Sequence, residues 1–228
     1  GELNAFTNKE DTVYYAAILK EHFTKAVDLL SDIVFHSLYP QSEINKEIEV
    51  ICDEIESYND SPAELIYDLF ENIIFHGHPL GHNILGDAWQ LRTYNSDTAK
   101  TFTQRFYKPQ NAVFFAYGDI NFDNLVDLLK KRTKGFGVQK PIIGDADIVA
   151  PLPAYQPTTK CIEKGTHQTH VMIGNRAYSV HDERRIALYL LNNIIGGPSM
   201  NARLNLLLRE RYGLVYTVES TMVSYSDT

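Results

Sequence analysis

The segment Ser42-Glu-Ile-Asn-Lys-Glu-Ile-Glu-Val-Ile-Cys-Asp-Glu-Ile55 carries the clearest helical pattern in this chain. Its apolar residues Ile44, Ile48, Ile51 and Ile55 fall on one narrow stripe when successive residues turn by about 100°. A stripe of this kind is typical of an amphipathic helix that buries one face. We therefore predict a helix here, with the isoleucines facing a core.

Two glutamates flank the isoleucine stripe. Glu47 and Glu54 lie seven residues apart, roughly 60–80° from the centre of the stripe and separated by about 10 Å of helix. A carboxylate at the rim of a buried face is well placed for a metal ligand or a general base. An amphipathic helix with an acidic surface explains the same residues, and this segment alone favours that simpler interpretation.

Further elements are predicted on both sides of this helix. Two strands between Asn4 and Leu19 surround a turn, and Ser61 followed by Pro62 marks the start of another helix. Helices are predicted near residues 22–38, 42–58, 62–75, 122–133, 181–195 and up to 211, with two short helices before 111, and strands near 111–118, 160–175 and 214–225. Interleaved helices and hairpins of this kind favour an α+β fold of sheet-plus-helix layers.

Proline marks a boundary within the chain. Four of the nine prolines lie in residues 135–159, which is typical of an extended connection between domains. We predict a first domain over residues 1–134, a linker over 135–158 and the start of a second domain over 159–228. Both sheet-plus-helix domains are expected to be incomplete in this chain.

The composition argues against several classes of function. The net charge of −8 and the pI near 5.5 argue against nucleic acid as a partner, because phosphate binding needs a basic face. The basic run from Lys130 to Lys134 is predicted to be a solvated helix end. The chain has no apolar run of about 18 residues that would span a membrane. Cys52 and Cys161 lie far apart and predict neither a thiolate zinc site nor a disulfide framework.

Three histidines in one loop are a candidate metal site. His76, His78 and His82 lie within seven residues and could converge on zinc. Gly77 and Pro79 indicate a turn-rich loop whose histidines are structural or solvated instead. The second interpretation is the favoured one.

The segment Arg209-Glu-Arg-Tyr-Gly-Leu-Val-Tyr216 is a second candidate for chemistry. Gly213 is predicted to end a helix whose last turn carries Arg209, and Tyr216 then lies in the strand that follows. A guanidinium and a phenol from adjacent elements could donate to one developing oxyanion. Taken alone, this segment favours the simpler interpretation, an arginine near a helix C-terminus followed by an aromatic residue in a strand.

Four segments in this order resemble the inverzincin metallopeptidases, the family of pitrilysin, insulin-degrading enzyme and mitochondrial processing peptidase, in its bacterial two-domain form. Each resembles one family motif. They are Asn4-Ala-x-Thr7, similar to the family's Asn-Ala-x-Thr strand; Glu47-x6-Glu54, similar to its paired glutamates; His78-Pro-Leu-Gly-His-Asn-Ile-Leu-Gly86, similar to the loop that follows; and Asn192 to Tyr216, similar to its glycine-rich loop and Leu-Arg-Glu-x-x-Gly-Leu-x-Tyr segment.

The resemblance implies a zinc metalloendopeptidase that cleaves extended or unfolded peptides. It implies that Glu54 is a zinc ligand and that Glu47 supports the site as a catalytic-centre carboxylate without chelating the same ion. The family's zinc motif is His-x-x-Glu-His, in which the histidines bind the metal and the glutamate activates water. Zinc is therefore the expected cofactor of the complete protein.

The resemblance also implies how a peptide is held. Asn4, Ala5 and Phe6 are expected to pair with the substrate backbone, which joins as an added strand. In relatives, the arginine and tyrosine that correspond to Arg209 and Tyr216 reach the zinc site from the opposite half of the molecule or from a partner subunit. A homodimer or a paired family subunit is therefore expected.

One departure from the family pattern is decisive for the chain on its own. His-x-x-Glu-His does not occur in these 228 residues. The family places it upstream of the Asn-Ala-x-Thr strand, so we expect it before Gly1. A catalytic zinc site takes about three protein ligands. This chain by itself is therefore predicted to be inactive and not to bind zinc tightly.

Two alternatives to the enzyme stay open. A family member that has lost its zinc motif would serve as a noncatalytic partner subunit, binding peptide and supplying Arg209 and Tyr216 in trans. A protein-binding module unrelated to peptidases would require four ordered motifs to occur by chance. Retention of both Glu47 and Glu54 favours the enzyme, because a degenerate site has little reason to keep them.

Overall fold

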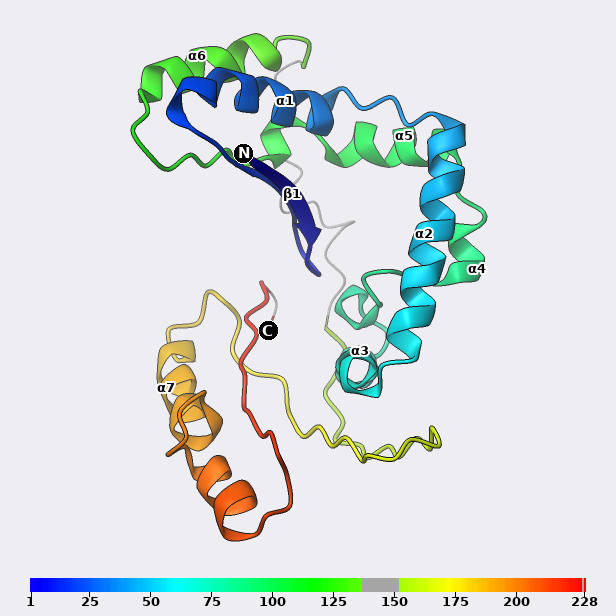
Figure 1. The fold of residues 1–228 in the computed structure, drawn as a ribbon, viewed down its shortest axis with the longest axis vertical. Helices are drawn as coiled ribbons and strands as arrows, with labels where there is room; N and C mark the ends of the chain where they lie inside the picture. The colour runs from blue at the N-terminus through cyan, green and yellow to red at the C-terminus, as the bar shows by residue number, and fades with distance from the viewer. Residues whose placement is uncertain (137–151, 227) are drawn as a thin grey trace. The chain divides into compact units, whose positions relative to one another are not determined.

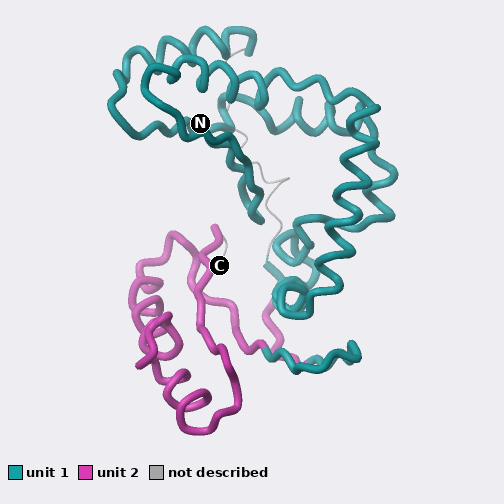
Figure 2. The backbone as a smooth tube through the Cα atoms, in the orientation of Figure 1, with its two compact units in different colours: residues 1–153, 160–171 teal, residues 154–159, 172–228 magenta. Residues whose placement is uncertain are grey.

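The computed structural model describes residues 1–136, 152–226 and 228. The chain divides into two compact units, residues 1–153 with 160–171 and residues 154–159 with 172–228, shown in different colours in Figure 2. The domain limits proposed from the sequence, 1–134 and 159–228, stay a prediction. Most of the proline-rich linker predicted over 135–158 lies outside the described residues.

The first unit begins with a β-hairpin of β1 (Glu2–Thr7) and β2 (Thr12–Ala17). The strands are antiparallel, with Asn4 opposite Tyr15 across the pair. The turn is closed by Asn8, whose backbone N–H donates to the Asp11 carbonyl at 2.8 Å and whose side-chain amide donates to the Asp11 carboxylate at 2.9 Å. The predicted pair of strands is confirmed, and within the described residues it is a sheet of two strands.

Helices make up most of the rest of the first unit, and they confirm the predicted helices over 22–38, 42–58, 62–75 and 122–133. Their bounds are η1 (Lys20–His22), α1 (Phe23–Phe35), α2 (Gln41–Asn59), α3 (Pro62–Ile74), η2 (Pro79–Gly81), α4 (Ala88–Leu91), α5 (Ser96–Phe106), η3 (Pro109–Asn111) and α6 (Phe122–Arg132). Figure 1 shows α1 beside α6, and α2 contacts both α3 and α4.

Helix α2 buries a narrower face than the sequence predicts. Ile48 and Cys52 are its buried residues, and Ile44, Ile51 and Ile55 are half-buried around them. The isoleucine stripe is therefore confirmed, with a cysteine at its centre. One turn of helix separates Ile48 from Cys52, so the two side chains stack on the same side of α2.

Helices α1 and α6 are joined by both apolar and charged contacts. Val27 of α1 and Leu125 of α6 are buried. Arg132 donates from Nε to one carboxylate oxygen of Asp28 at 2.7 Å, and its Nη2 lies 2.6 Å from the other. This fork-shaped pair raises the pKa of Arg132, chiefly through the hydrogen bond. Arg132 is exposed, as the predicted solvated helix end implies, and its carboxylate partner is on α1.

The second unit contains α7 (Arg185–Gly196) and the π-helical segment η4 (Asn205–Arg211). The wider turn shows in the hydrogen bond from the Tyr212 N–H to the Leu207 carbonyl, five residues earlier, at 3.1 Å. Gly213 ends this helix with φ of 60°, a left-handed conformation that glycine adopts without strain. The predicted helix stop is confirmed.

Three predicted strands, near 111–118, 160–175 and 214–225, form no ladder among the described residues. In the first of them Val113, Phe115 and Tyr117 are 96%, 86% and 95% exposed. A β-strand needs a neighbouring strand for its backbone hydrogen bonds, and an apolar run does not by itself provide that partner. The described residues also contain no helix with the length and apolar character that crossing a membrane requires.

Candidate zinc and peptide-binding site

The predicted peptide edge, Asn4, Ala5 and Phe6, lies in the middle of β1. All six residues of β1 are exposed, and among the described residues the strand pairs with β2 alone. The Asn4 side-chain oxygen accepts a hydrogen bond from the Ala5 N–H at 2.8 Å. One edge of β1 therefore faces outward, and an extended peptide approaching it would compete with this local hydrogen bond for the Ala5 amide.

The hairpin is held from its other strand by Tyr14, which lies opposite Ala5. Its hydroxyl is 3.3 Å from the hydroxyl of Tyr107, the residue that follows α5. Burial, followed by the hydrogen bond to Tyr107, raises the pKa of the Tyr14 phenol well above its usual range. Tyr14 therefore stays neutral in the physiological pH range and serves as a hydrogen-bonding partner for Tyr107.

The two candidate glutamates are both on α2 and both exposed. The helix separates Glu47 from Glu54 by nearly two turns, about 10 Å along its axis. The two carboxylates are therefore too far apart to bind the same ion directly. Neither side chain lies at the half-buried rim predicted from the sequence. Each is instead open to a partner from outside α2.

The described residues do not form a zinc site on their own. No three of their His, Cys, Asp and Glu side chains are grouped so as to hold a metal ion. Glu54 offers one carboxylate, whereas catalytic zinc takes about three protein ligands. The role of Glu54 as a zinc ligand therefore stays a prediction, and it requires further ligands in addition to this one carboxylate.

In the histidine loop, His78 has a structural role. His78 is 3% exposed, accepts a hydrogen bond at Nδ1 from the Leu80 N–H at 3.3 Å and lies against the ring of Phe75, whereas His76 and His82 are exposed. A Cβ at Gly81 would come within 2.6 Å of the Phe75 carbonyl oxygen, so glycine is needed at this close approach. The favoured structural interpretation of this loop accounts for His78.

Arg209 and Tyr216 both belong to the second unit. Arg209 lies in η4 with its side chain 46% exposed, and its Nε is 3.7 Å from the Glu210 carboxylate. Tyr216 is 91% exposed three residues beyond Gly213. Both side chains are therefore accessible to solvent. Their predicted role at an oxyanion stays a prediction.

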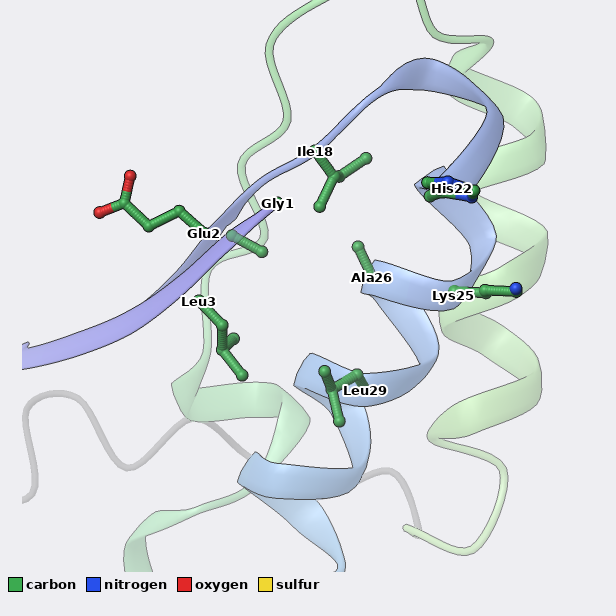
Figure 3. A pocket seen from close by; sticks show the side chains of 9 residues that line it. Gly1, Glu2, Leu3, Ile18, His22, Lys25, Ala26 and Leu29 are labelled. Atoms are coloured by element: carbon green, nitrogen blue, oxygen red, sulfur yellow. The ribbon is translucent and has the colours of Figure 1, made fainter.

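An apolar hollow of about 230 Å³ lies between the hairpin and α1. Figure 3 shows Leu3, Ile18, Ala26 and Leu29 around it, while the charged ends of Glu2 and Lys25 extend away. His22 also lines the hollow, beside these apolar side chains. The hollow adjoins the start of β1.

Two polar contacts were not anticipated from the sequence. Lys9, in the hairpin turn, has a side chain only 7% exposed and pairs with Glu71 of α3 at 2.9 Å. In the second unit, Asn192 and Ser220 bond to each other across 28 residues of chain. The residues around Lys9 and Asn192 do not indicate these contacts, because each partner is far away in sequence.

Comparison with known protein families gives two adjoining matches that together span almost the whole chain. Residues 1–88 match the model described as insulinase, peptidase family M16. Residues 93–228 match the model described as the peptidase M16 inactive domain. The first match contains β1 and Glu54, and the second contains Arg209 and Tyr216.

Curated relatives are similar along the full chain. An uncharacterized zinc protease of Bacillus subtilis is 34% identical over 100% of this chain and 54% of its own length. An uncharacterized zinc protease of Mycobacterium tuberculosis is 32% identical over 100% of this chain and 52% of its own length. The chain thus spans about half the length of the curated relatives it matches.

Solved structures show the same fold. A protease from Helicobacter pylori superposes with a TM-score of 0.78 at 19% identity, covering 99% of this chain and 55% of the other. A peptidase M16 inactive domain from Pseudomonas fluorescens gives a TM-score of 0.74 at 18% identity, covering 98% of this chain and 54% of the other. The predicted α+β sheet-plus-helix fold of this peptidase type is confirmed.

Proposed function

The chain belongs to the M16 peptidase family, and we propose that it takes part in zinc-dependent hydrolysis of peptide bonds in extended or unfolded polypeptides. The observation that carries the proposal is the open edge of β1. Within the described residues β1 pairs on one side only, and its residues are exposed throughout. Backbone pairing of this kind binds extended chains with few demands on their side chains.

The residue roles follow the sequence predictions. Glu54 is the zinc ligand that this chain supplies, and Glu47 orients the site electrostatically from almost two turns away on the same helix. Asn4, Ala5 and Phe6 hold the peptide backbone. The remaining zinc ligands come from outside these 228 residues, since no His-x-x-Glu-His occurs among them. The names of the zinc proteases of Bacillus subtilis and Mycobacterium tuberculosis support zinc as the ion.

Arg209 and Tyr216 act as hydrogen-bond donors to the oxyanion that forms when a peptide carbonyl is attacked. Their exposure supports this role, because a donor that serves a site elsewhere has to be accessible from outside its own unit. The π-helical turn around Arg209 also supports it, since π turns occur frequently at functional sites. A homodimer or a paired family subunit would let these donors act in trans.

The experiment that tests the proposal compares two glutamates of α2 in the full-length protein. Zinc content is measured by mass spectrometry, and hydrolysis is followed with an extended fluorogenic peptide. Glu54→Gln is expected to lose zinc and activity together. Glu56→Gln, an exposed glutamate on the same helix, is the matched control and is expected to keep both. Full zinc content in Glu54→Gln would remove Glu54 from the ligand set.

A second candidate function is that of a noncatalytic partner subunit. The description of the family model matching residues 93–228 as an inactive domain is compatible with it. In that case the full-length protein alone would bind the peptide without cleaving it, and adding a zinc-containing family subunit would produce activity. Hydrolysis by the protein alone would exclude this candidate.

A further inference from the structure

Lys9 lies in the turn that joins β1 to β2, yet its side chain is only 7% exposed. Its ammonium is 2.9 Å from the Glu71 carboxylate of α3 and also donates a hydrogen bond to the backbone carbonyl of His82. Turns are normally solvated, and lysine is among the residues least often buried. One buried cation therefore connects the hairpin to a helix and to the loop beyond that helix.

Two exposed lysine ion pairs of the described residues are of a different kind. Lys20 and Asp119 are 66% and 85% exposed, and Lys46 and Glu43 are 71% and 60% exposed. Exposed pairs of this type contribute little, because water competes for both charges. A buried ammonium instead depends on its partners, since removing one of them leaves an uncompensated charge. The Lys9 contacts thus fix a geometry that the exposed pairs do not.

The surroundings of Lys9 are acidic. Asp68 lies one turn before Glu71 on α3. Burial raises the pKa of the Asp68 carboxyl, the nearby Lys9 acts in the opposite direction, and Glu71 adds to the increase. Lys9 therefore offsets two neighbouring carboxylates on the same helix, and replacing it with a neutral residue would leave them facing each other.

The contacts of Lys9 span both parts of the proposed site. The hairpin carries the peptide edge Asn4 to Phe6, and Figure 1 shows its turn end directed toward α3. Helix α3 packs against α2, which carries Glu54. We propose that Lys9 is a positioning residue, holding the β1 edge at a fixed place relative to α2 so that a docked peptide meets the Glu54 site. This inference rests on the proposed function.

The test uses steady-state hydrolysis of an extended fluorogenic peptide by the zinc-loaded full-length protein. Lys9→Met is expected to raise KM about tenfold, as a loosened binding edge would, while kcat changes less than about twofold. The matched control Lys20→Met, which removes an exposed pair at the other end of the hairpin, is expected to leave KM unchanged. A merely structural role would lower the amount of folded protein without moving KM.

A second variant keeps the test independent of folding. Glu71→Gln retains the side-chain length and is also expected to raise KM. The double variant Lys9→Met with Glu71→Gln is expected to have the same KM as Lys9→Met alone, because both substitutions remove the same contact. Unchanged KM in both single variants, or fully additive effects in the double variant, would overturn the role of Lys9. Wild-type protein without hydrolysis would instead count against the proposed function. The variants would then be compared by fluorescence anisotropy of the labelled peptide, and equal Kd values would overturn the role of Lys9.

Discussion

Asn192 and Ser220 are joined by two hydrogen bonds. The Asn192 side-chain amide donates to the Ser220 carbonyl oxygen at 2.7 Å, and the Ser220 hydroxyl donates to the Asn192 side-chain oxygen. The Ser220 N–H also donates to the Gly196 carbonyl at 2.7 Å. Ser220, four residues beyond Tyr216, is thereby bonded to the end of α7.

The first prediction concerns the space at Gly196. A Cβ there would lie 2.6 Å from the Ser220 Cβ and 2.9 Å from the Ser220 nitrogen. Gly196→Ala is therefore expected to lower the free energy of unfolding of the second unit by about 1–3 kcal/mol through overpacking. Urea unfolding of the full-length protein, followed by hydrogen exchange within residues 185–225, measures the change. Gly135→Ala is the control, because no atom lies within 4 Å of the added Cβ.

The second prediction concerns the two cysteines. Cys52 is buried at 3% exposure in α2, whereas Cys161 is exposed. Iodoacetamide is expected to alkylate Cys161 quickly and Cys52 only after unfolding, since a thiol excluded from water cannot react. Peptide mapping by mass spectrometry, with and without urea, gives both rates. Fast alkylation of Cys52 in the native protein would contradict its burial at the centre of the α2 stripe.

The third prediction is a pH dependence at Asp68. Its pKa is raised in the folded state, mainly by desolvation, so the folded protein binds this proton more tightly than the unfolded chain does. The stabilisation is fully present below the unfolded pKa and is lost as the pH rises through the folded one. Asp68→Asn is therefore expected to raise Tm at pH 7 by a few degrees at most, because the carboxylate is partly solvated.

Thermal unfolding of wild-type and Asp68→Asn protein across a pH series measures this effect. The difference in Tm is expected to shrink as the pH falls, because the protonated carboxyl of the wild type then resembles the amide. A difference that grows toward low pH would mean that the fold stabilises Asp68 in its ionised form, which is the opposite of the expected sign.

The fourth prediction tests Arg209 in the full-length protein and rests on the proposed function. Arg209→Ala is expected to retain zinc but to lower kcat about a hundredfold, as the loss of one oxyanion donor does. Arg211→Ala is the matched control. Its guanidinium lies over the Tyr212 ring, 5.4 Å from the centroid, in the same helical turn. Normal turnover in Arg209→Ala would remove this residue from the mechanism.

Much of the local structure could be predicted from the sequence because its causes are local. The stripe of isoleucines in α2 and the glycine at Gly213 act within a few residues of themselves. The peptidase resemblance came from motif order along the chain, which is also a property of the sequence alone.

What only the tertiary structure decided depends on partners that are distant in sequence. Lys9 pairs with a residue of α3, Arg132 with a residue of α1, and Asn192 with Ser220. The predicted strand at 111–118 has the apolar composition of a strand but no ladder partner among the described residues. Residue type and periodicity determine which face of an element is apolar, whereas burial and strand pairing depend on what the rest of the chain places against it.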